Sequence, residues 1–357
     1  SYEKGARRAI LVDLSPAAVF IASVMNAPLD DFLSDGIDGV LGDFLKKEVV
    51  PLYAYSNGGS KDSFDYAVFS DWGECANCGG TFLLYDNIID EAQPCILSEY
   101  PCPHCGAIIK SDSAKKHFES IYDPWINENT RLAKTSMVLI SKKIGQRAVR
   151  RKPTAEDIKL YEEIGNRPVA LIPAKLEYTH MTHERNNLPE YWGISHIHHF
   201  YSRRNYYALS LVSSIKDEQM RRAALFCALT IMENNATRRN RFYIDKRRPN
   251  GSPIGPLSNT LYVPTLQTET NIGRKMLQVL ESIQKVRSSW PNTRALISNQ
   301  SATNLKQIPD SSIDFIFTDP PFGGNINYSE QNILYEWWLG IRTNNQQEAI
   351  TNSVQKK

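Results

Sequence analysis

The chain has 357 residues, 41% of them hydrophobic and 22% charged, which is ordinary for a soluble globular protein of two or three domains. Its net charge of +2 excludes a uniformly basic surface, so any attraction to nucleic acid must be local. No apolar run reaches membrane-spanning length, no signal peptide is visible, and the cysteine spacing suits a reducing compartment.

The first predicted element is a buried strand over residues 9–12. Asp13 stands at its carboxyl end, Ser15 is a suitable N-cap, and Pro16 fits the first position of a helix that runs to Met25. In nucleotide-binding α/β folds, an acid at this place accepts hydrogen bonds from ribose hydroxyls. The alternative is a solvated aspartate at the end of an ordinary strand.

Four of the six cysteines form two Cys-x-x-Cys pairs, each followed by glycine: Cys75 with Cys78, and Cys102 with Cys105. Two such turns provide four thiolates in tetrahedral arrangement, which predicts a structural zinc site because no position remains open for water. His104 inside the second pair is a weak substitute ligand. A disulfide pair or free core thiols are the alternatives, and short hairpins are expected around the site.

Residues 111–200 look irregular, with many aromatic, proline and polar residues. Five histidines fall between His180 and His199. A second metal site is conceivable there, but the direct adjacency of His198 and His199 and the lack of cysteines argue against one. We expect these histidines in loops and on the surface.

A helix capped by Ser202 is predicted to run to residue 215, and a second helix covers residues 216–235. A dense basic stretch with interleaved aromatic residues follows. Its candidate phosphate contacts are Arg238, Arg239, Arg241, Lys246, Arg247 and Arg248. Arg147, Arg150, Arg151 and Lys152 form a second basic cluster. A solvated charged loop explains either cluster equally well.

An amphipathic helix is predicted over residues 271–286 and a third strand over residues 294–297, followed by Gln300 and Ser301. Residues 313–317 then read as a short buried strand. The strand must end at Asp319, because the prolines that follow cannot extend a ladder.

The segment Asp319-Pro320-Pro321-Phe322 has the chemistry to hold a planar ring that carries an exocyclic amine. The Asp319 carboxylate and the Pro320 carbonyl can each accept one amine N–H. Phe322 can stack on the ring, a contact worth about 1–3 kcal/mol per base. A base of this kind must first leave the duplex stack.

This segment resembles motif IV of the amino-group DNA methyltransferases, which use S-adenosylmethionine (SAM). In that family, Asp at its first position with Pro-Pro-Phe implies adenine as the target. The stretch around Asp13 resembles motif II, whose acid holds the SAM ribose. The family often has an Asp near the SAM adenine where this chain has Gln300 and Ser301. Residues 325–340 resemble the region after motif IV in zinc-containing bacterial DNA methylases.

The resemblance implies an α/β fold with a partial Rossmann-like SAM-dependent methyltransferase core and a large zinc-containing α+β insertion. Residues 1–25 and 271–357 would form the core. Residues 26–270 would be a target-recognition insertion with a zinc ribbon at about 64–110. Because a first strand and a Gly-rich turn are not found, we expect a fragment of a longer enzyme that is inactive alone.

The implied activity is methyl transfer from SAM to the exocyclic amine of a flipped adenine in double-stranded DNA. The expected setting is the bacterial or archaeal cytoplasm, without membrane, and restriction or phage-defence proteins are candidate partners. The alternatives are a cytosine, RNA or protein-glutamine methyltransferase. A further alternative is a zinc-ribbon nucleic-acid-binding protein, without enzymatic activity, on a degenerate methyltransferase scaffold.

Overall fold

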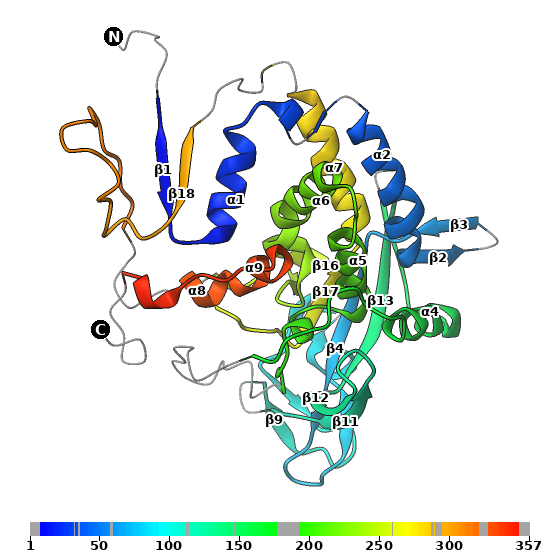
Figure 1. Ribbon diagram of the computed structural model, residues 1–357. Coiled ribbons are helices and arrows are strands. Elements are labelled where there is room, and N and C mark those ends of the chain that lie inside the picture. Colours follow the sequence, from blue (N-terminus) through cyan, green and yellow to red (C-terminus); the bar gives the residue numbers. More distant parts are fainter. Residues whose placement is uncertain are drawn as a thin grey trace.

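The computed structural model describes residues 8–31, 33–34, 36–57, 60–90, 92–111, 114–145, 147–176, 193–258, 260–286, 289, 295–320 and 328–349. It is a mixed α/β structure built around one large antiparallel sheet (Figure 1). In none of these residues is there a helix long and apolar enough to cross a membrane.

The large sheet has the strand order β14-β13-β4-β17-β15-β16, and the short strands β5 and β10 also pair with β4. Every pairing in it is antiparallel. Its strands are β4 (Tyr66–Glu74), β5 (Thr81–Leu83), β10 (Lys115–Lys116), β13 (Thr135–Ile144), β14 (Arg147–Arg151), β15 (Arg241–Asp245), β16 (Arg248–Ile254) and β17 (Leu266–Thr270).

The two faces of the sheet pack into two hydrophobic cores, because successive strand residues point to opposite faces. On β4, Ala67 and Phe69 join the larger core, which the helices cover. Val68 between them joins the smaller core beneath the cysteine-rich hairpins. The covering helices are α2 (Ile37–Phe44), α4 (Ala155–Gly165), α5 (Arg203–Ser213), α6 (Glu218–Ile231) and α7 (Ile272–Lys285).

The sheet curls so that its two outer strands approach each other. Arg150 on β14 donates hydrogen bonds to the backbone carbonyls of Asn250 and Gly251 on β16, the second at 2.7 Å. The same guanidinium contacts the Tyr66 hydroxyl at 3.1 Å. The edge strands β14 and β16 do not pair through backbone hydrogen bonds. The Arg150 guanidinium therefore connects the two edges of this half-barrel.

A separate pair of parallel strands contains the N-terminal motif. β1 (Ile10–Asp13) pairs in register with β18 (Leu296–Asn299), and α1 (Pro16–Met25) follows β1 directly. The Ser15 hydroxyl accepts the Ala18 N–H at 3.3 Å, which confirms the predicted N-cap and helix. The predicted strand is present one residue later, but its predicted burial is wrong, because its four residues are half-buried or exposed. The third predicted strand is also present, shifted by two residues.

The predicted Rossmann-like core is not shown by the described residues. Their parallel pairing is confined to β1 and β18, while the large sheet is antiparallel. The prediction of a buried strand at 313–317 is wrong for this structure: these residues form no strand, and Phe315, Ile316 and Phe317 are 80%, 74% and 84% exposed. A strand requires a hydrogen-bonded neighbour, and the described residues supply none to this segment.

The prediction that residues 111–200 are irregular is also wrong. They contain β10, β13, β14, α4 and the hairpin of β11 (Phe118–Asp123) with β12 (Glu128–Ala133). The helices predicted near 202–215, 216–235 and 271–286 are confirmed, with N-caps Ser202, Asp217 and Asn271. The basic stretch forms the β15–β16 hairpin.

The remaining elements are short. They are η1 (Leu29–Asp31), η2 (Leu45–Val49), η3 (Val50–Tyr53), β2 (Ala54–Asn57), β3 (Ser60–Ser63), α3 (Tyr85–Ile88), β6 (Ile89–Asp90), β7 (Cys95–Ile96), β8 (Glu99–Pro101), β9 (Ile108–Lys110), η6 (Ile197–Phe200), η7 (Met232–Ala236), α8 (Tyr328–Gln331), α9 (Ile333–Leu339) and η9 (Asn345–Gln347).

Candidate metal and cofactor sites

The four spaced cysteines meet at one point of the cysteine-rich module. The Sγ atoms of Cys75 and Cys105 are 3.8 Å apart, as are those of Cys78 and Cys102. Four thiolates at about 2.3 Å from a tetrahedral zinc ion lie about 3.8 Å from one another. All six cysteines of the chain are free thiols in the structure, which removes the disulfide alternative. The cluster can therefore hold a zinc ion.

Each pair of cysteines lies on a tight turn that the sequence dictates. The N–H of Gly79 donates to the Cys75 carbonyl at 2.8 Å, and the N–H of Gly106 donates to the Cys102 carbonyl at 2.9 Å. Both glycines have positive φ, 71° and 75°, which side chains rarely tolerate. The glycine after each pair is therefore part of the binding turn.

Hydrogen bonds favour the thiolate form of two of the ligands. The Asn77 amide and the Ala107 N–H lower the pKa of Cys105 to about 6, and the N–H groups of Cys78 and Asn77 lower that of Cys75. For Cys78 the Gly80 N–H lowers the pKa, but desolvation and the neighbouring sulfurs outweigh it and raise the pKa to about 12. A cation bound among the four sulfurs would stabilise the thiolates and so counteract the effects that raise the pKa of Cys78.

His104 is not placed as a ligand. Its Nε2 lies 2.9 Å from the Thr81 carbonyl, and its ring packs against Gly80. The module is anchored to the sheet instead by apolar contacts, since Phe82 and Tyr100 share a core with Phe242 of β15. The cysteine cluster thus borders the smaller hydrophobic core, which also contains residues of the large sheet.

Asp13 and β18 form the second site. Asp13 pairs with Asn299 across the parallel ladder, and both stand at the carboxyl ends of their strands. The Asn299 side-chain amide donates to the Asp13 and Leu14 carbonyls at 3.1 and 2.9 Å. The Asp13 carboxylate is exposed and accepts the Ser15 N–H at 2.7 Å. One oxygen of this carboxylate thus faces solvent at the place where α/β folds bind ligands.

Gln300 and Ser301 differ in how far they are available to a ligand. The Gln300 N–H donates to the Asp13 carbonyl at 3.0 Å, while its side-chain nitrogen is buried without a hydrogen-bond partner among the described residues. The Ser301 hydroxyl already donates to the Gln347 carbonyl at 3.1 Å and contacts Thr303. Gln300 is therefore the better candidate for a ligand contact.

The Asp-Pro-Pro-Phe segment is only partly described. Asp319 and Pro320 are exposed, and Pro321 and Phe322 lie outside the described residues. In the helices that follow, Ser329 donates to Glu348 from its hydroxyl at 2.6 Å and from its N–H at 3.1 Å. Its hydroxyl is therefore engaged within the protein, whereas Tyr328 remains 39% exposed.

The first two arginines of the basic stretch support the fold. Arg239 is 1% exposed and donates to both carboxylate oxygens of Glu233 at 3.0 and 3.3 Å. Arg238 donates to Gln267 at 2.7 Å and to the His199 carbonyl at 3.2 Å. Both guanidinium groups are used inside the protein, so neither is free to meet a DNA phosphate in this structure.

The rest of the basic stretch lies on the β15–β16 hairpin. Arg241 donates to the Gly255 carbonyl at 3.0 Å, and Arg248 pairs with Asp245 at 2.8 Å. Lys246 and Arg247 are exposed at the turn. Of the six predicted phosphate contacts, these two have the most accessible cationic groups. In the second basic cluster, Arg147 and Lys152 are exposed, while Arg150 and Arg151 are engaged.

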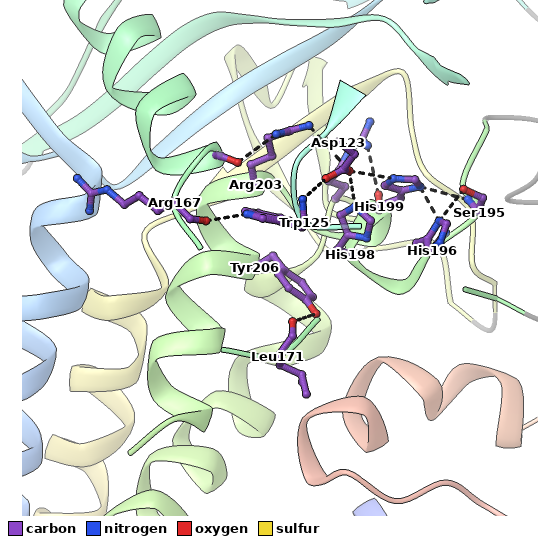
Figure 2. A network of polar contacts seen from close by, with 12 residues as sticks. Asp123, Trp125, Arg167, Leu171, Ser195, His196, His198, His199, Arg203 and Tyr206 are labelled. Carbon is purple, nitrogen blue, oxygen red and sulfur yellow. Dashed lines mark hydrogen bonds and ion pairs between the residues drawn. The ribbon is translucent and has the colours of Figure 1, made fainter. Parts of the chain in front are cut away.

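All five histidines were predicted to lie in loops and on the surface, and for three of them the predicted surface position is wrong. His196, His198 and His199 are buried, at 7%, 4% and 3% exposure, and gather around the buried Asp123 at the end of β11 (Figure 2). His180 and His183 lie outside the described residues. The His198 Nε2 lies 2.7 Å from Asp123, which binds the β11–β12 turn to η6.

A metal does not suit this cluster, although Asp123, His198 and His199 lie close together. A metal-bound histidine normally donates its other ring N–H. The Nδ1 of His199 instead faces the backbone N–H groups of Ser195 and His196, at 3.2 and 3.4 Å, so it must accept and its Nε2 keeps the proton. Asp123 also has a guanidinium nitrogen of Arg203 at 3.9 Å.

The histidine cluster should make the protein sensitive to mild acid. Burial lowers the pKa of His198 and lowers that of His199 to about 3. The unfolded chain then binds more protons than the folded one between about pH 6.5 and pH 3, so stability falls as the pH drops through this window. Each histidine contributes at most about 1.4 kcal/mol per pH unit.

We expect His199→Asn, whose side-chain oxygen can still accept the two N–H groups, to show a shallower loss of the unfolding temperature between pH 6.5 and 4. Ser195→Ala removes a hydroxyl beside His196 but no titrating group, so it should keep the wild-type slope. Both variants retain the cysteine cluster, so the acid lability of a bound metal cancels in the comparison. An identical slope in all three proteins would contradict the prediction.

Sequence reasoning missed three polar residues that organise these sites: Asp123, Asn299 and Glu336. Asn299 had a detectable signal, because it is a polar residue that closely follows a predicted strand, as Asp13 does. Asp123 and Glu336 gave none, since their partners are 75 and 321 residues away in the chain.

Comparison with protein-family models, with curated proteins and with solved structures found no match for this chain.

Proposed function

We propose that this chain forms part of a SAM-dependent DNA methyltransferase that acts on the exocyclic amine of adenine. The observation that carries the proposal is the parallel pairing of Asp13 with Asn299, with α1 beginning three residues after Asp13. A strand that ends in an exposed acid, a helix directly after it and a parallel neighbour is the arrangement that binds nucleosides in α/β folds.

An incomplete parallel sheet supports the same proposal. β1 is paired on one edge, by β18, and parallel strands are normally covered on both faces within larger sheets. In the view of Figure 1 the loop that contains residues 313–317 extends past the other edge of β1. Covering Phe315, Ile316 and Phe317 would stabilise the protein by about 1.5–3 kcal/mol each. The two-stranded parallel ladder and these exposed apolar side chains are what part of a larger parallel sheet would present.

The residues have separate roles in this proposal. Asp13 would accept hydrogen bonds from the ribose hydroxyls. The Gln300 side-chain nitrogen, which has no partner among the described residues, would contact the adenine of SAM. The bound SAM supplies an electrophilic methyl group. Asp319 and the Pro320 carbonyl would accept the two N–H groups of the target amine and orient its nitrogen lone pair toward that methyl, which is mainly a proximity effect.

DNA is the proposed partner because the chain has, in addition to this half-site, a cysteine module and a β15–β16 turn with exposed cationic side chains. Lys246 and Arg247 would contact phosphates, and the insertion would hold the target strand. The same two features favour a second candidate function, a nucleic-acid-binding zinc protein without methyl transfer. Cytosine, RNA and protein-glutamine targets remain alternatives within the methyltransferase proposal.

Binding of S-adenosylhomocysteine to the natural full-length protein tests the proposal and separates the two functions. We expect binding by calorimetry, weakened about ten- to a hundredfold by Asp13→Ala, since hydrogen bonds to a charged group are worth about 1.5–3 kcal/mol. Asp43→Ala removes an exposed carboxylate near the end of α2 and should leave the affinity unchanged. Absence of binding in the wild-type protein would favour the non-enzymatic alternative.

A further inference from the structure

Glu336 on α9 is buried although it is a carboxylate. It is 1% exposed, and its two oxygens are fully used: Oε1 accepts the Ser15 hydroxyl at 3.1 Å, and Oε2 accepts the Thr343 N–H at 2.7 Å. The Thr343 hydroxyl also donates to Oε1. A carboxylate is seldom buried unless such donors compensate for its desolvation.

The Ser15 contact connects two regions that are 321 residues apart in the chain. Ser15 caps α1, and its N–H holds the Asp13 carboxylate at 2.7 Å. α9 follows Asp319 in sequence by way of α8. One continuous chain of hydrogen bonds therefore runs from the acid of the candidate cofactor site to the helix that follows the candidate catalytic segment.

The opposite side of α9 is fixed to the insertion. The Trp338 indole N–H donates to the Tyr201 hydroxyl at 3.0 Å, and that hydroxyl donates to the Leu334 carbonyl at 2.8 Å. The Trp337 indole N–H lies 3.1 Å from the Tyr206 hydroxyl on α5. With these contacts in place α9 cannot rotate freely, so Glu336 presents a fixed acceptor to Ser15.

We infer that Glu336 is a positioning residue, which holds Asp13 and the start of α1 in a fixed place relative to α9, the longer of the two described α-helices that follow Asp319 in the chain. Its significance for methyl transfer rests on the proposed function, whereas the connection itself does not. The negative charge is required because three donors converge on one group. A neutral amide at position 336 can accept only through its oxygen, so its NH₂ must face one of these donors.

Hydrogen exchange of the 357-residue chain, read by mass spectrometry, tests the connection without SAM or DNA. For Glu336→Gln we expect amides of residues 13–19 to exchange about ten- to a hundredfold faster, from the loss of charge-assisted hydrogen bonds. Peptides of residues 70–110 should be unchanged. Tyr335→Phe, which removes a 3.3 Å hydrogen bond to Glu233 from the same helix, should leave residues 13–19 protected.

A double-mutant comparison covers the case in which Glu336→Gln loosens the whole protein. If the two residues act through one bond, adding Glu336→Gln to Ser15→Ala should produce no further acceleration in residues 13–19. Additive acceleration, or unchanged exchange in Glu336→Gln alone, would overturn the inference. Thr343→Val, which removes one donor but keeps the backbone N–H, should have a smaller effect than Glu336→Gln.

A third measurement separates this inference from the proposed function. In the natural full-length protein, Glu336→Gln should raise the dissociation constant for S-adenosylhomocysteine while DNA affinity stays constant. If the wild-type protein binds no S-adenosylhomocysteine, the proposed function fails, and the exchange experiment still decides the role of Glu336. If binding is unaltered by Glu336→Gln, Glu336 does not position Asp13.

Discussion

Chelation of a zinc ion bound at the cysteine cluster should unfold the cysteine-rich module and leave the helical side of the sheet folded. Structural zinc contributes about 10–16 kcal/mol of apparent binding free energy in small domains, more than a module of this size gains from its own packing. Cys75 and Cys102 belong to the smaller core with Phe82 and Tyr100. Loss of the ion therefore exposes that core as well as the thiols.

The matched variants are Cys102→Ser and Cys95→Ser. Cys102 is a buried member of the cluster, whereas Cys95 is a half-buried thiol on β7 of the same module, outside the cluster. We expect native mass spectrometry to find one zinc ion per chain in the wild-type protein and in Cys95→Ser, and none in Cys102→Ser. Proteolysis should then cut Cys102→Ser between residues 75 and 110. If residues 75–110 remained fully protected from proteolysis after chelation, the metal would not have a structural role.

The elements that could be predicted from sequence are those with local signals. Ser15 and Pro16 mark the start of α1, and Ser202 marks the start of α5, because a cap and a helix period need only neighbouring residues. The cysteine pairs are equally local, since spacing and glycine define the turn before any tertiary contact forms. Each of these predictions depends on fewer than about 15 consecutive residues.

The failures share a dependence on distant partners. Residues 313–317 have strand composition, but no sequence window shows whether a neighbouring strand is present, and the structure leaves them exposed. β13 was missed because its pairing with β4 begins more than sixty residues away, at Thr135 opposite Asp71. Burial of His198 likewise depends on Asp123, which gives no signal in its own segment.

The basic stretch shows that predictions of function from sequence also fail where distant partners decide the outcome. Charge density alone marked six residues as phosphate contacts, yet Arg238 and Arg239 have internal partners in Gln267 and Glu233. Guanidinium groups are suited to both uses, since their donor geometry fits carboxylates and phosphates alike. The fold decides between these uses, and it leaves Lys246 and Arg247 exposed.

Under the proposed function, Asp319→Ala should lower the rate of methyl transfer about a hundred- to a thousandfold, the usual cost of one preorganised polar group. The measurement is incorporation of labelled methyl from SAM into DNA by the natural full-length protein. Asp314→Ala is the matched control, because Asp314 is exposed in the same segment and should leave the rate unchanged. An unaltered rate in Asp319→Ala would show that Asp319 takes no part in the reaction.

The variants that affect methyl transfer should differ from those that affect DNA binding. Measuring both quantities therefore separates the reaction from DNA recognition. Asp319→Ala should retain its DNA affinity, because under the proposed function the carboxylate would contact a flipped base and no phosphate. Lys246→Glu with Arg247→Glu should weaken binding and reduce the dependence of log affinity on log salt by about 0.9 for each lost phosphate contact. At saturating DNA the rate of this double variant should stay near wild type, because the orientation of the amine by Asp319 is unchanged. A fall in the rate at saturation would mean that the β15–β16 turn also positions the target base.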